Sequence, residues 1–189
     1  PFKIARRKPK PMPKGFVVAT LESVMPLASM KVKGPDGNMT DWRGLLDWAK
    51  YVGADAFWML GGQTPGLGKD EIWMKTNLSM IPKVAEECHK RGLQFGVYAM
   101  VSLTMSKAAL PGYEYGLEIK DGQPVVTRAI SIRDQKRVSD VAAFLKPFAD
   151  DPNVDWVGLD YIRNALGGYE LVDDFVAEVA ATDCVVATD

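Results

Sequence analysis

Short apolar runs recur along the chain, separated by longer segments in which apolar residues return every three or four positions. The short runs have the length and the aromatic or β-branched content of buried strands, and they cover residues 15–20, 54–60, 93–101 and 154–159. The longer segments predict amphipathic helices over residues 41–51, about 77–91, 139–148 and 169–181. Strands that alternate with helices in this way predict a parallel sheet with right-handed crossovers.

Three segments depart from this alternation. Residues 118–126 alternate in polarity around an Asp-Gly pair, which predicts a β-hairpin within an excursion at about 107–130. Residues 1–14 are rich in Pro and Lys and predict an extended basic arm or linker, which leaves 15–189 as the folded portion. Residues 184–188 predict a fifth strand of the sheet.

The glycine pattern bears on which parallel-sheet fold is expected. An open doubly wound sheet commonly carries a glycine-rich phosphate loop, and neither GxGxxG nor GxxxxGK[ST] occurs in the sequence. This absence favours a (β/α)8 barrel of the TIM type. Four repeats amount to half of such a barrel, for which about 250 residues are typical. We therefore expect the N-terminal half to two-thirds of a barrel, completed by a missing remainder or a partner chain.

Charge and composition narrow the classes of partner. The net charge is −1, so electrostatics favour neither a nucleic acid nor an anionic membrane surface. No window reaches the roughly 18 continuous apolar residues of a membrane span. Two cysteines and one histidine provide neither a disulfide scaffold nor a zinc site of recognised spacing. We expect no metal and no cofactor.

The strongest candidate for chemistry is the end of the fourth predicted strand. Residues 154–163 read VDWVGLDYIR, so Asp160, Tyr161 and Arg163 come where an apolar strand ends. Parallel strands of α/β folds present their functional side chains at this carboxyl end. Two interpretations stay open. Asp160 lines a pocket, where Arg163 favours its ionised form, or it only caps the next turn or pairs structurally with Arg163.

Other polar side chains follow the ends of the remaining predicted strands. Glu22 follows the first strand, Gln63 the second, and Tyr98 and Ser102 belong to the third. We expect these residues, together with Tyr161 and Arg163, to line a substrate pocket with Asp160. A structural role for each is equally compatible with the pattern.

The run ending LDYIR, together with LQFGVYAMVS after Arg91 and Gly92, is similar to strands of bacterial glycoside-hydrolase-like (β/α)8 proteins. The likeness extends over residues 15–180. The resemblance implies a hydrolase acting on a poly- or oligosaccharide, with Asp160 as nucleophile or base. It also implies an extracellular or periplasmic location.

Glycoside cleavage requires a second carboxyl group on the other side of the scissile bond. Glu22 and Asp189 are candidates, and the partner acid could also lie in sequence beyond this chain. One alternative function is a non-catalytic carbohydrate-binding or scaffolding barrel. Another is a non-glycosidic barrel enzyme that uses Lys75 or Lys107 to form a Schiff base.

Overall fold

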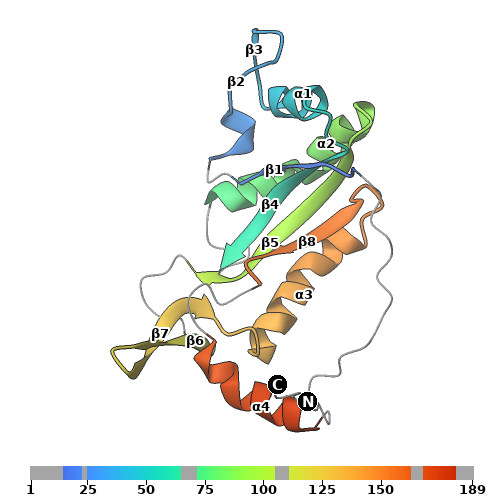
Figure 1. Ribbon diagram of the computed structural model, residues 1–189. Helices are drawn as coiled ribbons and strands as arrows, with labels where there is room; N and C mark the ends of the chain where they lie inside the picture. Colours follow the sequence, from blue (N-terminus) through green and yellow to red (C-terminus); the bar gives the residue numbers. More distant parts are fainter. Residues whose placement is uncertain (1–14, 23–24, 65–71, 105–110, 163–167, 182–189) are drawn as a thin grey trace.

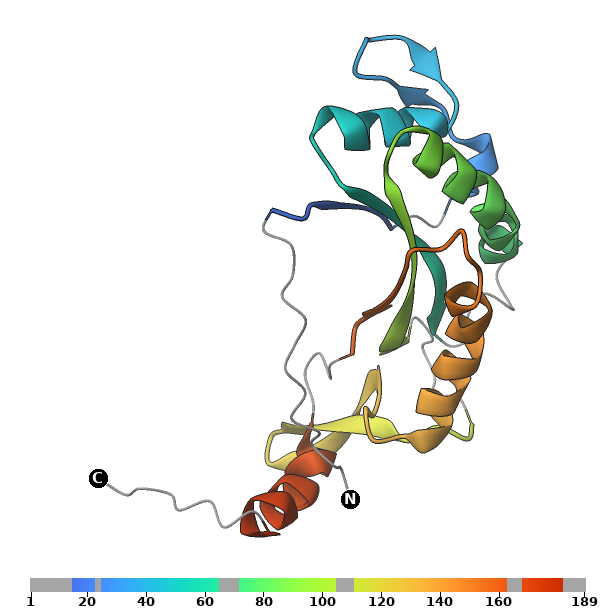
Figure 2. The ribbon, with the colours of Figure 1, turned by 90° about the vertical axis from the view of Figure 1, so that its right-hand side faces the viewer.

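The computed structural model describes residues 15–22, 25–64, 72–104, 111–162 and 168–181, which form a mixed α/β fold (Figure 1). Four strands run parallel in chain order, and they are β1 (Val18–Leu21), β4 (Ala56–Thr64), β5 (Gln94–Thr104) and β8 (Trp156–Asp160). Three helices cover one face of these strands, and they are α1 (Arg43–Tyr51), α2 (Ile72–Lys90) and α3 (Gln135–Ala149). Figure 2 shows α2 and α3 along one side of the sheet, and α1 packs into the same core. No helix of the described ranges packs on the other side, which we call the helix-free face.

The predicted barrel is wrong, because the sheet is open. It contains six strands, and β1 and β8 form edges of the parallel part, where β1 pairs with β4 and β8 pairs with β5. Within the described ranges these two edge strands do not pair with each other. Alternating strands and helices specify local β-α units, whereas closure requires a matched tilt and stagger over all strands. The local pattern does not encode that long-range condition.

The edge position of β8 also changes its surroundings. An apolar run such as 154–159 predicts burial on both faces, yet Val157 is 41% exposed and Leu159 is 56% exposed. Strand β5 covers only one of its edges. An apolar strand therefore lies at the rim of the sheet rather than inside it.

Two helices begin earlier than their apolar periodicity predicts. Helix α2 starts at Ile72 rather than near residue 77. Helix α3 starts at Gln135 rather than near Ser139, because Asp134 caps it by accepting the backbone N–H of Arg137 at 2.6 Å. Such a cap satisfies one of the free N–H groups of a first helical turn. Pro147 stays within the last turn of α3.

The predicted hairpin is confirmed as β6 (Tyr115–Lys120) and β7 (Gln123–Ile130). Its turn residues Asp121 and Gly122 have φ values of 52° and 74°, the left-handed backbone that such a two-residue turn requires. The hairpin does not stand beside the sheet as predicted. Strand β7 pairs antiparallel with the far end of β5, through Leu103 and Ala129, and so extends the sheet.

The remaining elements precede α1 or follow β8. The segment between β1 and α1 contains a short helix and a two-stranded ribbon, namely η1 (Leu27–Ser29), β2 (Val32–Lys33) and β3 (Met39–Thr40). The predicted last helix is present as η2 (Tyr169–Leu171) followed by α4 (Val172–Ala181). The basic arm and the fifth strand predicted over 184–188 lie outside the described residues. None of the helices in the described ranges has the length and hydrophobicity that a bilayer-spanning segment needs.

The main hydrophobic core lies between the helices and the sheet. It contains Phe57 and Met59 of β4 and Phe95 and Val97 of β5, packed against α1 and α2. Side chains alternate between the two faces of a strand, so the residues between these core positions point to the helix-free face. The side chains at the intervening positions of β4, β5 and β8 are therefore the candidates for a functional site on that face.

Candidate functional site

The carboxyl ends of the parallel strands bring four of the predicted site residues to the helix-free face, namely Glu22, Tyr98, Asp160 and Tyr161. Tyr98 pairs with Gly158 and Met100 pairs with Asp160, so Tyr98 and Asp160 share this face one step apart. Leu21 pairs with Met59 and points to the helices, so Glu22, the next residue, follows on the opposite side. The strand register therefore places Glu22, Tyr98 and Asp160 at the carboxyl ends of the parallel strands, on the helix-free face.

Tyr98 lies at the centre of this arrangement. Its side chain is 5% exposed, and its hydroxyl donates a hydrogen bond to the carbonyl oxygen of Leu21 at 3.3 Å. Because Leu21 ends β1, the phenol reaches from β5 across β4 to the residue before Glu22. Apolar side chains pack around it on the same face, namely Trp58, Leu60, Met100 and Tyr161.

The electrostatics of Tyr98 indicate that both carboxylates are near the phenol. Burial of the phenol is the largest cause that raises its pKa. The negative charges of Glu22 and Asp160 raise the pKa further, and Tyr161 adds a smaller electrostatic effect in the same direction. Both effects disfavour a phenolate. Tyr98 consequently stays protonated at neutral pH, and its single O–H donates to the carbonyl oxygen of Leu21.

Asp160 has a structural contact as well as partial exposure. Its Oδ1 accepts the backbone N–H of Tyr161 at 2.7 Å, and the carbonyl oxygen of Tyr161 accepts the N–H of Ser102 at 2.9 Å. Tyr161 has a φ of 50°, a left-handed conformation that is unusual for a bulky residue and commonly found at functional sites. Asp160 therefore bonds to the backbone of the residue that follows it, while its side chain remains partly open to solvent.

The other predicted site residues do not join this cluster in the described part of the chain. Ser102 is buried and lines a separate groove between α3 and β8. The side chain of Gln63 and the whole of Arg163 lie outside the described residues, as do Lys107 and Asp189. The predicted pair between Asp160 and Arg163 therefore stays a prediction.

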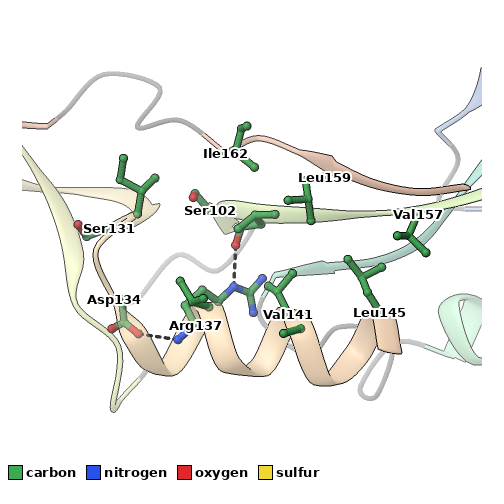
Figure 3. Close-up of a pocket in the computed structure, with 13 residues that line it drawn as sticks. Ser102, Ser131, Asp134, Arg137, Val141, Leu145, Val157, Leu159 and Ile162 are labelled. Atoms are coloured by element: carbon green, nitrogen blue, oxygen red, sulfur yellow. Dashed lines mark hydrogen bonds between the residues drawn. The ribbon is translucent and has the colours of Figure 1, made fainter. Parts of the chain in front are cut away.

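The groove between α3 and β8 was not predicted from the sequence. Its volume is about 580 Å³, and Figure 3 shows Val141 and Leu145 of α3 pointing from the helix toward Val157 and Leu159 of β8. At one end Arg137 is fully buried and donates to the carbonyl oxygens of Val101 at 2.6 Å and Met100 at 3.2 Å. The apolar residues of α3 recur every three or four positions, and this pattern could have indicated one wall of the groove. The other wall is β8, and its exposure depends on the open sheet.

The pKa of Arg137 is lowered, chiefly by its burial. Its bonds to the carbonyls of β5 compensate part of that cost and join α3 to the strand. Asp134, which caps α3, also accepts the N–H of Glu114 at 2.5 Å. The polar end of the groove is therefore a joint between α3, β5 and the hairpin.

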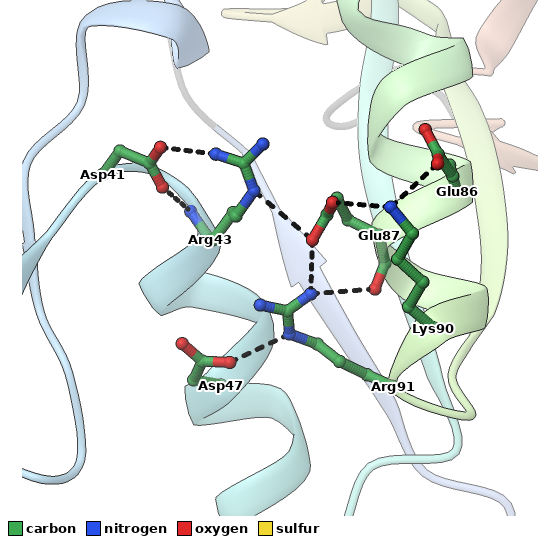
Figure 4. Close-up of polar contacts among 7 residues, drawn as sticks. All are labelled: Asp41, Arg43, Asp47, Glu86, Glu87, Lys90 and Arg91. Atoms are coloured by element: carbon green, nitrogen blue, oxygen red, sulfur yellow. Dashed lines mark hydrogen bonds and ion pairs between the residues drawn. The ribbon is translucent and has the colours of Figure 1, made fainter.

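A third polar cluster joins α1 to α2 (Figure 4). Glu87 accepts Arg91 at 2.7 Å and contacts Arg43 at 3.3 Å and Lys90 at 3.2 Å. Because its carboxylate is held by three cations, its pKa falls to about 2, with the hydrogen bond from Arg91 as the largest cause. This arrangement locks a charge in place and suits a structural role.

Metal chemistry has no candidate centre in the described ranges. No group of three or more His, Cys, Asp or Glu side chains there is arranged to hold a metal ion. His89, the only histidine, contacts Asp155 through Nε2 at 2.9 Å, and the same carboxylate oxygen accepts the N–H of Phe95 at 2.8 Å. This contact joins α2 to the start of β8, away from the carboxyl ends of the strands.

No model of a known protein family matches the chain, and no curated protein sequence matches it significantly.

Proposed function

We propose that the chain is a glycoside hydrolase acting on a poly- or oligosaccharide, with Asp160 and Glu22 as its pair of carboxylates. The observation that carries this proposal is the approach of both acids to the buried phenol of Tyr98 at one end of the parallel strands. Glycosidic cleavage uses two carboxyl groups, one donating a proton to the leaving oxygen and the other acting as nucleophile or base. The helix-free face leaves this pair open to a substrate.

Tyr98 and its neighbours have complementary roles in this proposal. The phenol of Tyr98 stays protonated and donates to Leu21, and its oxygen can accept a hydrogen bond from a sugar hydroxyl without a change in charge. The aromatic ring of Tyr161 follows Asp160 directly and offers an apolar surface against which the C–H face of a sugar ring can pack. The left-handed backbone of Tyr161 sets the direction of that ring.

The strand order favours cleavage with inversion. Strands β1 and β8 are separated by β4 and β5, so their backbones lie about 14 Å apart at the usual spacing of roughly 4.8 Å. Retaining enzymes hold their carboxyl groups ~5–5.5 Å apart, whereas inverting enzymes leave ~6.5–9.5 Å for a water molecule. We expect the first product to have the opposite anomeric configuration to the substrate, as followed by proton NMR during hydrolysis. Retention of configuration would contradict the assignment of Glu22.

The experiment is a comparison of carboxylate variants on a panel of oligosaccharides. Asp160→Asn and Glu22→Gln each keep the size of the side chain, and we expect each to lower kcat by about 10²–10⁴-fold. Asp121→Asn in the hairpin turn and Glu86→Gln on α2 are matched controls that should keep full activity. Circular dichroism checks that every variant is folded. Unchanged turnover in Asp160→Asn would remove the proposal.

A non-catalytic carbohydrate-binding protein is the second candidate. The apolar and aromatic side chains around Tyr98 favour it, since a binding site needs such a surface but no pair of acids. It predicts that sugars bind without turnover and that Asp160→Asn leaves their affinity unchanged. Isothermal titration beside the hydrolysis assay separates the two functions.

A further inference from the structure

The groove between α3 and β8 is an apolar surface without a covering element in the described part of the chain. Val138 of α3 and Val157 and Leu159 of β8 line it and are each more than 40% exposed. Its polar members already have partners, because Arg137 donates to two carbonyls of β5 and Asp134 accepts two backbone N–H groups. What remains is apolar surface, and this favours an apolar side-chain face over a polar ligand.

Helix α4 presents a second apolar surface of the same chain. Phe175 is 69% exposed and Val176 is 58% exposed, and Val172 lies on the same side one turn earlier. Residues spaced at i, i+3 and i+4 form the stripe with which a helix normally covers a sheet. In α1, α2 and α3 the corresponding stripe faces the sheet, whereas Figure 2 shows the axis of α4 leading away from α3.

The start of α4 is anchored at one end of the groove. The carboxylate of Glu170 accepts the hydroxyl of Ser131 at 2.9 Å and the N–H of Leu117 at 2.7 Å. Ser131 is itself a lining residue at the end of the groove where α3 begins. Before this anchor, Gly168 has a φ of 123°, which only glycine adopts readily.

We propose that α4 turns about Leu171 and Val172 and packs lengthwise into the groove between α3 and β8. The helix has ten residues and is therefore about 15 Å long, shorter than the 15-residue α3 beside it. In this position Val172, Phe175 and Val176 face Val138 and Leu159, and α4 runs parallel to α3. The proposal does not depend on the proposed function.

One interaction that opposes this movement is an exposed ion pair. Arg133 pairs with Asp174 at 3.2 Å in the observed arrangement, and both side chains are at least one-third exposed. An exposed ion pair contributes little to stability, whereas burial of a phenylalanine and a valine contributes substantially more. Arg133 also donates to the carbonyl oxygen of Glu170, and this bond can persist because Glu170 stays in place.

Disulfide trapping tests the proposal directly. In the full chain with Cys184→Ser, the pair Val138→Cys and Val176→Cys places one thiol on each apolar surface, while Cys88 is fully buried. The matched control pairs Val138→Cys with Ala177→Cys, which points to another side of α4. We expect the first pair to cross-link about tenfold faster, at the mass of a single chain, because a disulfide needs Cα atoms within about 7 Å.

Two results of this experiment would overturn the proposal. Equal rates for the two pairs would mean that the apolar face of α4 has no preferred contact with α3. Cross-linked dimers would mean that a second copy fills the groove. A measurement without cysteines is the melting temperature of Phe175→Lys, which should fall if Phe175 packs in the groove. An unchanged melting temperature would contradict the docking of α4.

Discussion

At the scale of single residues, the helix-free face depends on close contact between one indole ring and two glycines. Trp58 lies over Gly96 and Gly158, and a Cβ atom added at either glycine would come within 2.5 Å of its ring. The indole Nε1 is buried with no hydrogen-bond partner in the described part of the structure. The ring is therefore held by packing. The positions of β5 and β8, which carry Tyr98 and Asp160, depend on that close contact.

Replacing Gly158 by alanine should disturb this contact. We expect Gly158→Ala to lower the free energy of unfolding by about 1–3 kcal/mol, because the added methyl group overlaps Trp58 and the Cβ of Tyr98. Urea denaturation measures this change. The double variant Trp58→Leu with Gly158→Ala should show a smaller loss than the sum of the single variants. Additive losses would mean that the two residues are not in contact.

At the scale of elements, helices α1 and α2 are joined by side chains that the apolar pattern does not reveal. Arg91 at the end of α2 donates to Asp47 of α1 at 2.9 Å and to Glu87 at 2.7 Å. Arg43 at the start of α1 completes the link to Glu87 (Figure 4). Glu87 is 14% exposed in its side chain, so it is the least solvated carboxylate of this network.

The network predicts a defined pH dependence of stability. The pKa of Glu87 is lowered from 4.5 to about 2 in the folded chain, so the folded state favours its ionised form. The resulting stabilisation is present above pH 4.5 and is lost as the pH falls through about 2. We expect Glu87→Gln to be less stable than the unmodified chain at pH 7 by roughly 1 kcal/mol, and the difference to vanish toward pH 2.

Thermal unfolding followed by circular dichroism between pH 2 and pH 7 measures this difference. Glu86→Gln is the matched control, because the Glu86 side chain is 62% exposed and pairs only with Lys90 among the described residues. It should change stability little at any pH. A difference for Glu87→Gln that stays constant with pH would contradict the role assigned to its charge.

At the scale of the whole molecule, a parallel part and an antiparallel part of the sheet are joined at β5. Strand β8 pairs with its first half and β4 pairs along its whole length, whereas the hairpin pairs with its far end through β7. Glu170 links this hairpin to the segment that starts α4, through Leu117 and Ser131. A single buried carboxylate therefore connects the hairpin to a segment that lies 39 to 53 residues later in the sequence.

Removal of this carboxylate should loosen the hairpin. We expect Glu170→Ala to speed the amide hydrogen exchange of Leu117 by about tenfold or more, since the loss of one buried hydrogen bond to a charged group costs about 1.5–3 kcal/mol. Exchange in β4 and the first half of β5 should not change. Equal acceleration throughout the sheet would indicate global destabilisation instead of a local role.

The sequence alone determined the local units of this protein. Apolar periodicity predicted the parallel strands and their helices, and the Asp-Gly pair predicted the turn of the hairpin. The rule that parallel strands present polar side chains at their carboxyl ends also indicated Glu22, Gln63, Tyr98, Ser102 and Asp160 as candidates, without separating those that share one face. These features depend on residues near one another in the chain, or on a rule that holds for every parallel sheet.

Only the tertiary structure decided how far these units extend and what they leave uncovered. The open edge at β8, the pairing of β7 with β5 and the groove beside α3 depend on contacts between residues far apart in sequence. The early start of α3 depends on Asp134, whose carboxylate is also held by the backbone of Glu114. Such contacts are set by packing and by hydrogen bonds in three dimensions, and local hydrophobic patterns do not specify them.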